Sequence, residues 1–205
     1  VTPSYENNGI ICAGNAETFT IVVNPSPEME NVDDFVLCNN EISSIIEFTT
    51  PNTDGDTTYT WTNDNTSIGL SSSGNGDIPS FTAINLNPIT EVATITVTPT
   101  YENNGVVCIG DPQTFSISVL SEIEISGSTV DALDCNDPNS GNINITVTGG
   151  SGVYDFLWSN GAITEDLNNI GPGDYSVSVT DSEGCIAISE TFNICLLYTS
   201  DAADD

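Results

Sequence analysis

Basic side chains are missing from this chain: its 205 residues contain no Lys, no Arg and no His, against 30 Asp and Glu, so the formal net charge is −30. Nucleic-acid binding depends on cationic contacts with phosphate, and the composition therefore excludes it. Catalysis by Ser-His-Asp or Cys-His groups, Schiff-base lysines and histidine-ligated zinc are excluded within the chain as well. A glycosidase pair of carboxylates would need an aromatic cleft, which no motif indicates. We predict no catalytic residues.

Long hydrophobic runs are also missing, since no apolar stretch reaches the roughly 18–20 residues that span a bilayer. No transmembrane segment is therefore expected in this sequence. Without internal salt bridges, a fold so rich in mutually repelling carboxylates must be stabilised by burial, β-ladders and covalent bonds. Salt should relieve that repulsion by shortening the Debye length.

The most informative feature present is a repeat. Residues 97–119, VTPTYENNGVVCIGDPQTFSISV, repeat residues 1–23, VTPSYENNGIICAGNAETFTIVV, without a gap. Alternation of Ala93, Ile95 and Val97 with threonines is typical of a half-buried antiparallel strand. The repeat predicts one all-β module per period. We expect residues 1–27 to be the closing hairpin of a further module upstream, which would make the sequence a fragment.

Residues 28–120 form the first complete predicted module. Its strands include an alternating segment, Thr58–Thr62, that is expected to bury Tyr59 and Trp61. A central-strand Trp in about ninety residues is typical of an immunoglobulin-like antiparallel β-sandwich. The order of C-N-x-E, YTWT, ATITVTPTY and TFSISV resembles the PKD-like repeats of large bacterial surface proteins.

Residues 121–194 form the second predicted module, in which Ile143, Ile145 and Val147 alternate. The string GGSGVYDFLWSNG, followed by GPGDYSVSVTDSEGC, resembles the SprB-type repeat of adhesins from gliding bacteria over residues 135–192. The resemblance implies a small β-sandwich in a secreted, surface-displayed protein involved in adhesion and gliding and exported by the type IX system. It implies no catalytic residues.

The last eleven residues, 195–205, do not follow the pattern of either module. They can be translated from the transposase end sequence used to prepare sequencing libraries, and we interpret them as an artefact of sequencing.

The remaining cysteines bracket the predicted modules. Cys38 and Cys108 flank the first module and Cys135 and Cys185 the second, so we predict the disulfides Cys38–Cys108 and Cys135–Cys185. Cys12 is the repeat-mate of Cys108, and truncation would leave it unpaired. Free buried thiols are the alternative. The absence of C-x-x-C spacing argues against metal ligation.

Two acidic groups are candidates for Ca²⁺ binding. Asn52, Asp54 and Asp56 have the spacing of a loop site but lack the Gly and Glu of an EF-hand, and Asp134 and Asp137 lie near the junction of the modules. The alternative is that these residues make the hydrogen bonds of turns. We therefore predict no confident metal site and no cofactor.

These features predict tandem immunoglobulin-like modules in a non-catalytic, extracellular structural or adhesive protein. Its partners would be neighbouring repeats of the same chain and an unidentified surface, polysaccharide or protein ligand. The alternative function is a carbohydrate-binding accessory region of a secreted polysaccharide-degrading enzyme, which exposed aromatic residues in a row on one sheet face would favour. The inward register of Trp61 and Trp158 predicts core positions instead.

Overall fold

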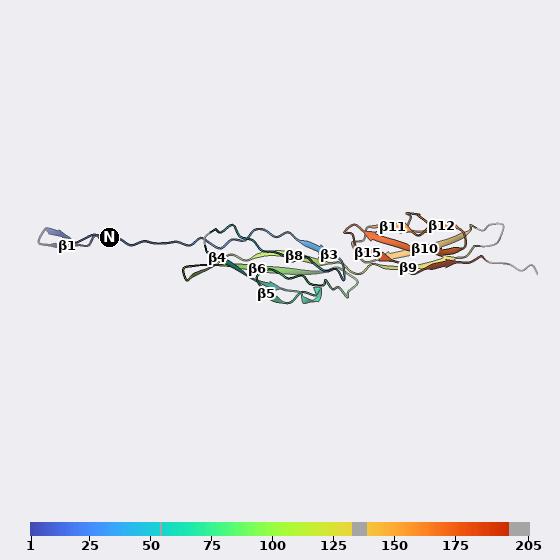
Figure 1. Cartoon of the computed structure of the whole chain (residues 1–205), viewed down its shortest axis with the longest axis horizontal. Helices are drawn as coiled ribbons and strands as arrows, with labels where there is room; N and C mark the ends of the chain where they lie inside the picture. Colours follow the sequence, from blue (N-terminus) through green and yellow to red (C-terminus); the bar gives the residue numbers. More distant parts are fainter. Residues whose placement is uncertain (54, 133–138, 197–205) are drawn as a thin grey trace, which may run out of the picture.

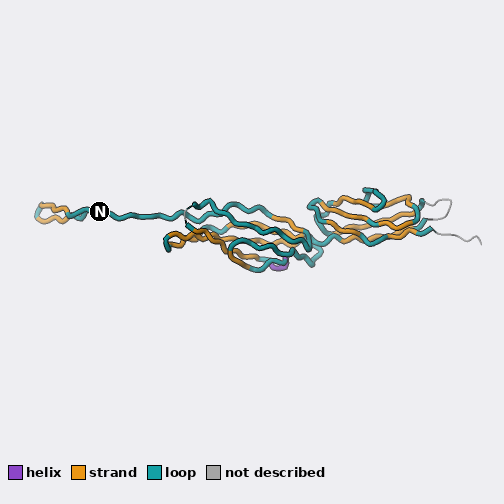
Figure 2. Tube along the Cα trace, viewed as in Figure 1, coloured by secondary structure: helices purple, strands orange, loops and turns teal. Residues whose placement is uncertain are grey.

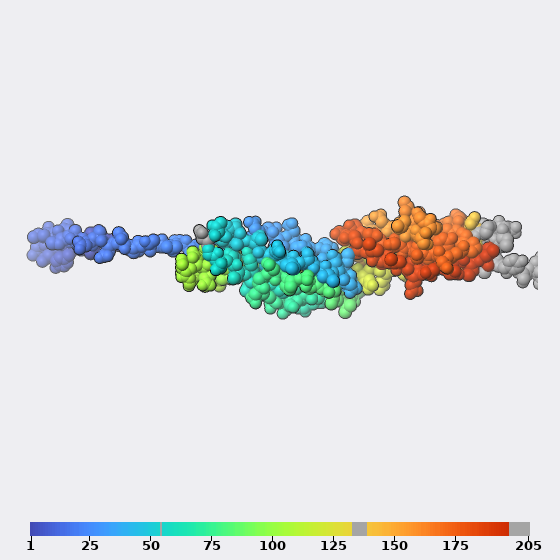
Figure 3. All heavy atoms as spheres, viewed as in Figure 1, coloured from blue at the N-terminus to red at the C-terminus, as the bar shows by residue number. Residues whose placement is uncertain are grey.

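The computed structural model describes residues 1–53, 55–132 and 139–196. Two β-modules lie end to end along the long axis (Figure 1), and a thin N-terminal segment extends from the first of them (Figure 3). Strands and the loops between them make up nearly all of the described chain, with a single short 3₁₀ turn at Thr66–Ile68 (Figure 2). The predicted fold class, all-β with tandem immunoglobulin-like sandwiches, is confirmed.

The N-terminal segment carries one small hairpin, β1 (Ser4–Asn7) and β2 (Ile10–Ala13). Its two-residue turn, Asn8-Gly9, has positive φ at both positions, 50° and 81°, as a type I′ turn requires. Residues 1–23 are exposed throughout. The hairpin therefore stands apart from both modules.

The first module is built on one six-stranded sheet. Its strands are β3 (Phe35–Leu37), β4 (Asp56–Asn63), β5 (Ser73–Asn75), β6 (Glu91–Asn103), β7 (Val106–Ile109) and β8 (Gln113–Val119). The order is β3-β8-β6-β4-β5, and β7 pairs with the far half of β6. All pairs are antiparallel except β3 with β8. This parallel pair directs the end of β3 toward the second module.

A layer of extended, irregular segments covers one face of this sheet. It is held together by paired backbone bonds, such as the two reciprocal 3.0 Å bonds between Ile46 and Ile78. Tyr59 and Trp61 on β4 and Ile95 on β6 are buried between the layers, as their alternation predicts. Phe48 packs its ring 5.4 Å from that of Tyr59, which joins the irregular layer to the sheet.

The second module has shorter strands arranged in small sheets. The strands are β9 (Glu124–Val130), β10 (Gly141–Thr148), β11 (Tyr154–Trp158), β12 (Leu167–Ile170), β13 (Gly173–Tyr175), β14 (Val177–Asp181), β15 (Ile186–Ile188) and β16 (Phe192–Ile194). The sheets are β12-β10-β9, β11-β14-β15 and β13-β16. Ile143 of β10 and Val179 of β14, both fully buried, belong to one core with Trp158.

The described part of the C-terminal tail continues this module. Ala132 bridges Leu196 in parallel, and the Ala132 N–H donates to the Cys195 carbonyl at 3.0 Å. Leu196 packs against the core of the second module. The interpretation of residues 195–205 as an artefact stays a prediction, although the first two of these residues do pair with the fold.

Candidate functional site: the covalent junction between modules

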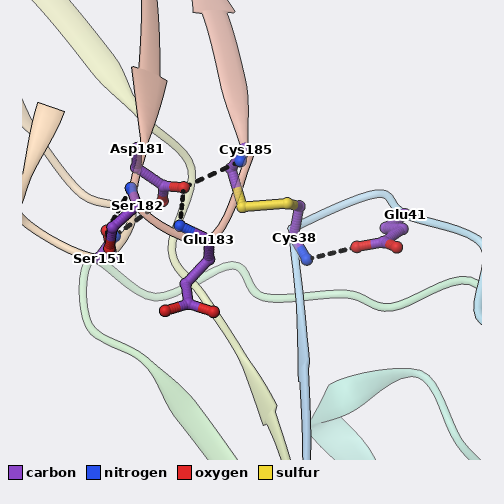
Figure 4. Close-up of a disulfide and its surroundings, with 7 residues drawn as sticks. All are labelled: Cys38, Glu41, Ser151, Asp181, Ser182, Glu183 and Cys185. Carbon is purple, nitrogen blue, oxygen red and sulfur yellow. Dashed lines mark hydrogen bonds between the residues drawn. A yellow bond between two sulfur atoms is a disulfide. The ribbon is translucent and has the colours of Figure 1, made fainter. Parts of the chain in front are cut away.

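The two modules are joined by a disulfide. Cys38, directly after β3, and Cys185, directly before β15, are bonded at 2.04 Å with their Cα atoms 5.5 Å apart (Figure 4). The bond connects residues 147 positions apart in the sequence. Cys185 is buried and Cys38 packs against the same core cluster. The disulfide is therefore a structural bond between modules.

This pairing corrects the prediction that each disulfide closes one module. Cys38–Cys108 is wrong because the two residues lie at opposite ends of the sheet: Leu37 is level with Val119 and Glu91, whereas Cys108 is level with Tyr101. Ten positions along β6 correspond to roughly 30 Å, several times the separation that a disulfide can bridge.

The second predicted pair, Cys135–Cys185, is also replaced, since Cys185 is bonded to Cys38. Cys135 itself lies outside the described residues. Among the described cysteines, Cys12 and Cys195 are free and exposed, and Cys108 is free and half-buried.

A buried carboxylate positions Cys185. Asp181 is 4% exposed, and its Oδ1 accepts the backbone N–H groups of Glu183 and Cys185, both at 2.9 Å. Its Oδ2 accepts the N–H of Ser151, also at 2.9 Å. Three backbone donors thus satisfy a charge for which the chain has no cation, and they fix the turn that carries the disulfide (Figure 4). Burial, and then the Asp181 charge, raise the pKa of nearby Tyr154.

On the first module, Glu41 has the corresponding role. Its carboxylate accepts the N–H of Cys38 at 2.8 Å. Both cysteines are therefore held through their own backbone N–H groups by carboxylates of their own modules, which places the sulfur atoms independently of one another.

Backbone bonds reinforce the junction. The Leu120 N–H donates to the Leu37 carbonyl at 2.9 Å, and the Gly150 N–H donates to the Ser121 carbonyl at 3.1 Å. A Cβ on Gly149 would come within 1.9 Å of the Glu122 carbonyl oxygen, so this close approach of the loop to the linker requires glycine. The junction is a fitted contact in addition to a covalent one.

Two shallow hollows flank this contact. One of about 460 Å³ is lined by residues 85–88 of the first module and by Glu122, Glu124 and Gly149. The other, of about 330 Å³, includes the disulfide and Asn39. Asparagine and glutamate side chains line both hollows together with apolar ones such as Leu86 and Ile186, so neither is the predominantly apolar pocket typical of a ligand site.

The structure describes only some of the residues predicted to bind Ca²⁺. Asp54, Asp134 and Asp137 lie outside the described residues, and Asp56 begins β4 opposite Glu102. Within the described ranges, no three carboxylate, thiol or imidazole groups gather as a metal site would require. Calcium binding therefore stays a prediction.

Carboxylates elsewhere also accept from the backbone or from neutral side chains. Asp34 accepts the Ser116 N–H at 2.7 Å, which lowers the pKa of its carboxyl group. Bonds from Asn65, Asn87 and Ser67 lower the pKa of Glu91. In a chain without basic side chains, N–H and O–H donors thus replace the salt bridges of ordinary proteins.

Both tryptophans are core residues, as predicted: Trp61 is 4% and Trp158 2% exposed. Trp158 donates its indole N–H to the Thr164 carbonyl at 2.8 Å. Within the described parts of the two modules, no aromatic side chain is classed as exposed. The row of exposed rings expected of a carbohydrate-binding face is thus not found in these ranges.

Comparison with known proteins gives one family match, to part of the second module. A family model described as the SprB repeat matches residues 127–163. No curated protein matches the chain. Within the described residues, no helix is long and apolar enough to cross a membrane.

Solved structures with similar folds are distant in sequence. A C-terminal intimin fragment, solved in complex with the intimin-binding domain of its translocated receptor, is 14% identical with a TM-score of 0.44, covering 84% of this chain and 63% of the fragment. Extracellular domains 3–5 of Drosophila OTK are 13% identical with a TM-score of 0.44, covering 85% of this chain and 61% of theirs. Amphioxus IgVJ-C2 is 12% identical with a TM-score of 0.37, covering 78% of this chain and 99% of its own. The chain thus spans less than two thirds of the length of the first two structures.

The repeat match and the disulfide together indicate an extracellular structural domain. The residues that sequence reasoning missed are those of the junction, Asp181 above all. The Asp-x-x-x-Cys spacing of the turn was the available signal, because a carboxylate four residues before the cysteine can accept its N–H.

Proposed function

We propose that this chain is a load-bearing stalk segment of a multidomain adhesin displayed on the cell surface. The observation that carries the proposal is the disulfide between Cys38 and Cys185. It closes a loop around most of both modules, from the end of the first strand of one to the last hairpin of the other. A covalent bond of this kind between modules matters most to a protein that is pulled from its ends.

Tension between the chain ends would pass through the disulfide. The force would enter along β3, cross from Cys38 to Cys185 and leave through β15 and β16. Because β3 lies parallel to β8, a pull along the module axis loads their hydrogen bonds in shear, so that they must break together. The backbone between the two cysteines is bypassed by the disulfide and is not extended while that bond is intact.

Single-molecule force spectroscopy tests this proposal directly. Pulling the oxidised chain from both ends should extend only the segments outside the loop. Reduction should then release the chain between the cysteines, which are 147 positions apart, and add about 500 Å of contour length at roughly 3.3–3.6 Å per residue. Full extension of both modules in the oxidised chain would refute the load-bearing role.

A matched control is available in the chain. Cys108→Ser removes a free thiol from the first module and should leave the extension trace unchanged. Cys185→Ser should give the reduced trace without reductant.

The finer assignment rests on resemblance. The PKD-like pattern of residues 28–120, the SprB-type string of residues 135–192 and the acidic surface support a secreted adhesin of gliding bacteria, exported by the type IX system. A structural disulfide supports an oxidising, extracellular location. The partners we propose are neighbouring repeats and a surface, polysaccharide or protein ligand.

A further inference from the structure

Three cysteines of the chain share one local sequence. Cys12, Cys108 and Cys185 are each followed by Thr-Phe at the sixth and seventh positions and by Ile at the ninth. The shared pattern extends across the boundary between the two kinds of module, although these differ elsewhere. Of the three cysteines, Cys185 is the one that forms a disulfide in this structure, and its partner lies in the preceding module.

Cys108 and Cys185 also occupy the same place in the fold. Each follows the turn after a central strand, β6 or β14. Cys108 lies in the next short strand, β7, and Cys185 directly precedes β15, and both come before the last strand of the module, β8 or β16. Phe115 and Phe192, at the shared Phe position, both pack inward. Cys108 lies at the end of the first module remote from Cys38, which is the end that faces upstream.

We propose that Cys108 is the acceptor of a disulfide from the preceding repeat, from the cysteine equivalent to Cys38. Each module would then carry one cysteine at its downstream end, bonded to the next module, and one at its upstream end, bonded to the previous one. The bonds would join successive repeats covalently along the array. This goes beyond the stalk proposal, which depends on Cys38–Cys185 alone.

The linker before the first module supports this arrangement. Asn24 is the repeat-mate of Leu120, whose N–H donates to Leu37, the neighbour of Cys38. The Asn24 amide contacts Asn103 at 3.4 Å and the Val106 carbonyl at 3.5 Å, two residues from Cys108. By this correspondence, Asn24 would lie next to the upstream counterpart of Cys38. Its contacts with Asn103 and Val106 place it at the turn that carries Cys108.

The bond would form by thiol–disulfide exchange with a small-molecule or protein disulfide donor. One cysteine thiolate attacks the donor and releases half of it as a thiol, and the second thiolate then displaces the other half. Both cysteines are oxidised, and the donor disulfide is reduced to two thiols that take up the two protons.

The test is an extended chain in which a copy of residues 28–96 is placed before Val1, so that residues 1–23 complete an added upstream module. The added copy carries Val36→Ile as a mass tag, at a side chain that is 47% exposed. After equilibration with oxidised glutathione, cleavage at glutamate yields separate peptides for Cys38 (31–41), Cys108 (103–122), Cys12 (7–17) and Cys185 (184–190). We expect the tagged Cys38 peptide to be linked to the Cys108 peptide, and the untagged one to the Cys185 peptide.

Bonding of the tagged Cys38 to Cys12, or a free Cys108 after equilibration, would overturn the proposal while leaving the stalk proposal intact. Cys108→Ser in the extended chain should free the tagged Cys38, whereas Cys12→Ser should not. A second extended chain, with tagged residues 28–119 placed directly before Asn24, gives the added module the sequence that is folded here. The same link is expected there, and its absence would refute the proposal independently of how residues 1–23 fold.

Discussion

The cores of the two modules differ in what they need from their neighbour. The buried core of the first module lies wholly between Met29 and Val119. The core of the second module includes Leu120 and Ile123 from the linker and is packed by Cys38 from the first module. The first module is self-contained, and the second is completed by the junction. The second module is therefore fully stabilised only as part of the two-module pair.

The two modules also differ in the interactions that stabilise them. The first module relies on long strands and a cluster of rings, Phe35, Phe48, Tyr59 and Phe115. The second relies on short strands whose turns are fixed by polar groups, such as Asp181 and the Tyr175 hydroxyl, which donates to the Gly171 carbonyl at 3.0 Å. Damage to packing should thus affect the first module most, and damage to turns the second.

The largest effect is expected from Cys185→Ser, which opens the disulfide. The chain-entropy relation gives about 5 kcal/mol for a loop of this length. Because the second module depends on the junction, its melting temperature should fall more than that of the first, and a single calorimetric transition should separate into two.

Cys108→Ser is the matched control, since that thiol is free in this chain and its loss should not shift either transition. Equal destabilisation of both modules by Cys185→Ser would contradict the view that only the second needs the junction.

Asp181→Ala should come next, with a loss of about 3 kcal/mol that is confined to the second module. The substitution leaves the N–H groups of Ser151, Glu183 and Cys185 without their acceptor in a buried turn. Denaturant unfolding followed by Trp158 fluorescence would measure it. Asp155→Ala, on the exposed side of β11, is the control, and a similar loss there would show that general charge effects dominate.

Gly74→Ala should destabilise the first module alone, by about 2 kcal/mol. A Cβ at this position of β5 would lie 2.3 Å from Cζ2 of Trp61, and the ring is enclosed by the core. Trp61 fluorescence in a Trp158→Phe background reports on this module. Ser73→Ala, its exposed neighbour, should have little effect; an unchanged midpoint for Gly74→Ala would mean that the ring can move aside.

Much of the fold could be predicted because period-two alternation reports burial directly: Ala93, Ile95 and Val97 are fully buried as expected. The disulfide could not be predicted in this way. Cysteines that bracket a module in sequence are brought together only if the strands that carry them end on the same side. The parallel pairing of β3 with β8 places Cys38 at the downstream end, and alternation does not distinguish parallel from antiparallel neighbours.

The smallest effect concerns acid and the first module. Bonds from Asn65 and Asn87 lower the pKa of Glu91 below its ordinary value of 4.5, so the folded state favours the ionised form. A lowered pKa contributes stability that is present above pH 4.5 and is lost as the pH falls through the folded-state value. Glu91→Gln cannot titrate. The variant should therefore be less stable than the parent chain at pH 7, and the gap should close as the pH falls through the folded-state pKa of Glu91. Relief of carboxylate repulsion acts on both chains nearly alike and cancels in the difference.

Denaturation midpoints from pH 7 to pH 2.5 would measure the gap, with Glu47→Gln as the exposed control. A gap that stays constant across this range would mean that the ionised carboxylate of Glu91 adds nothing that a neutral amide does not.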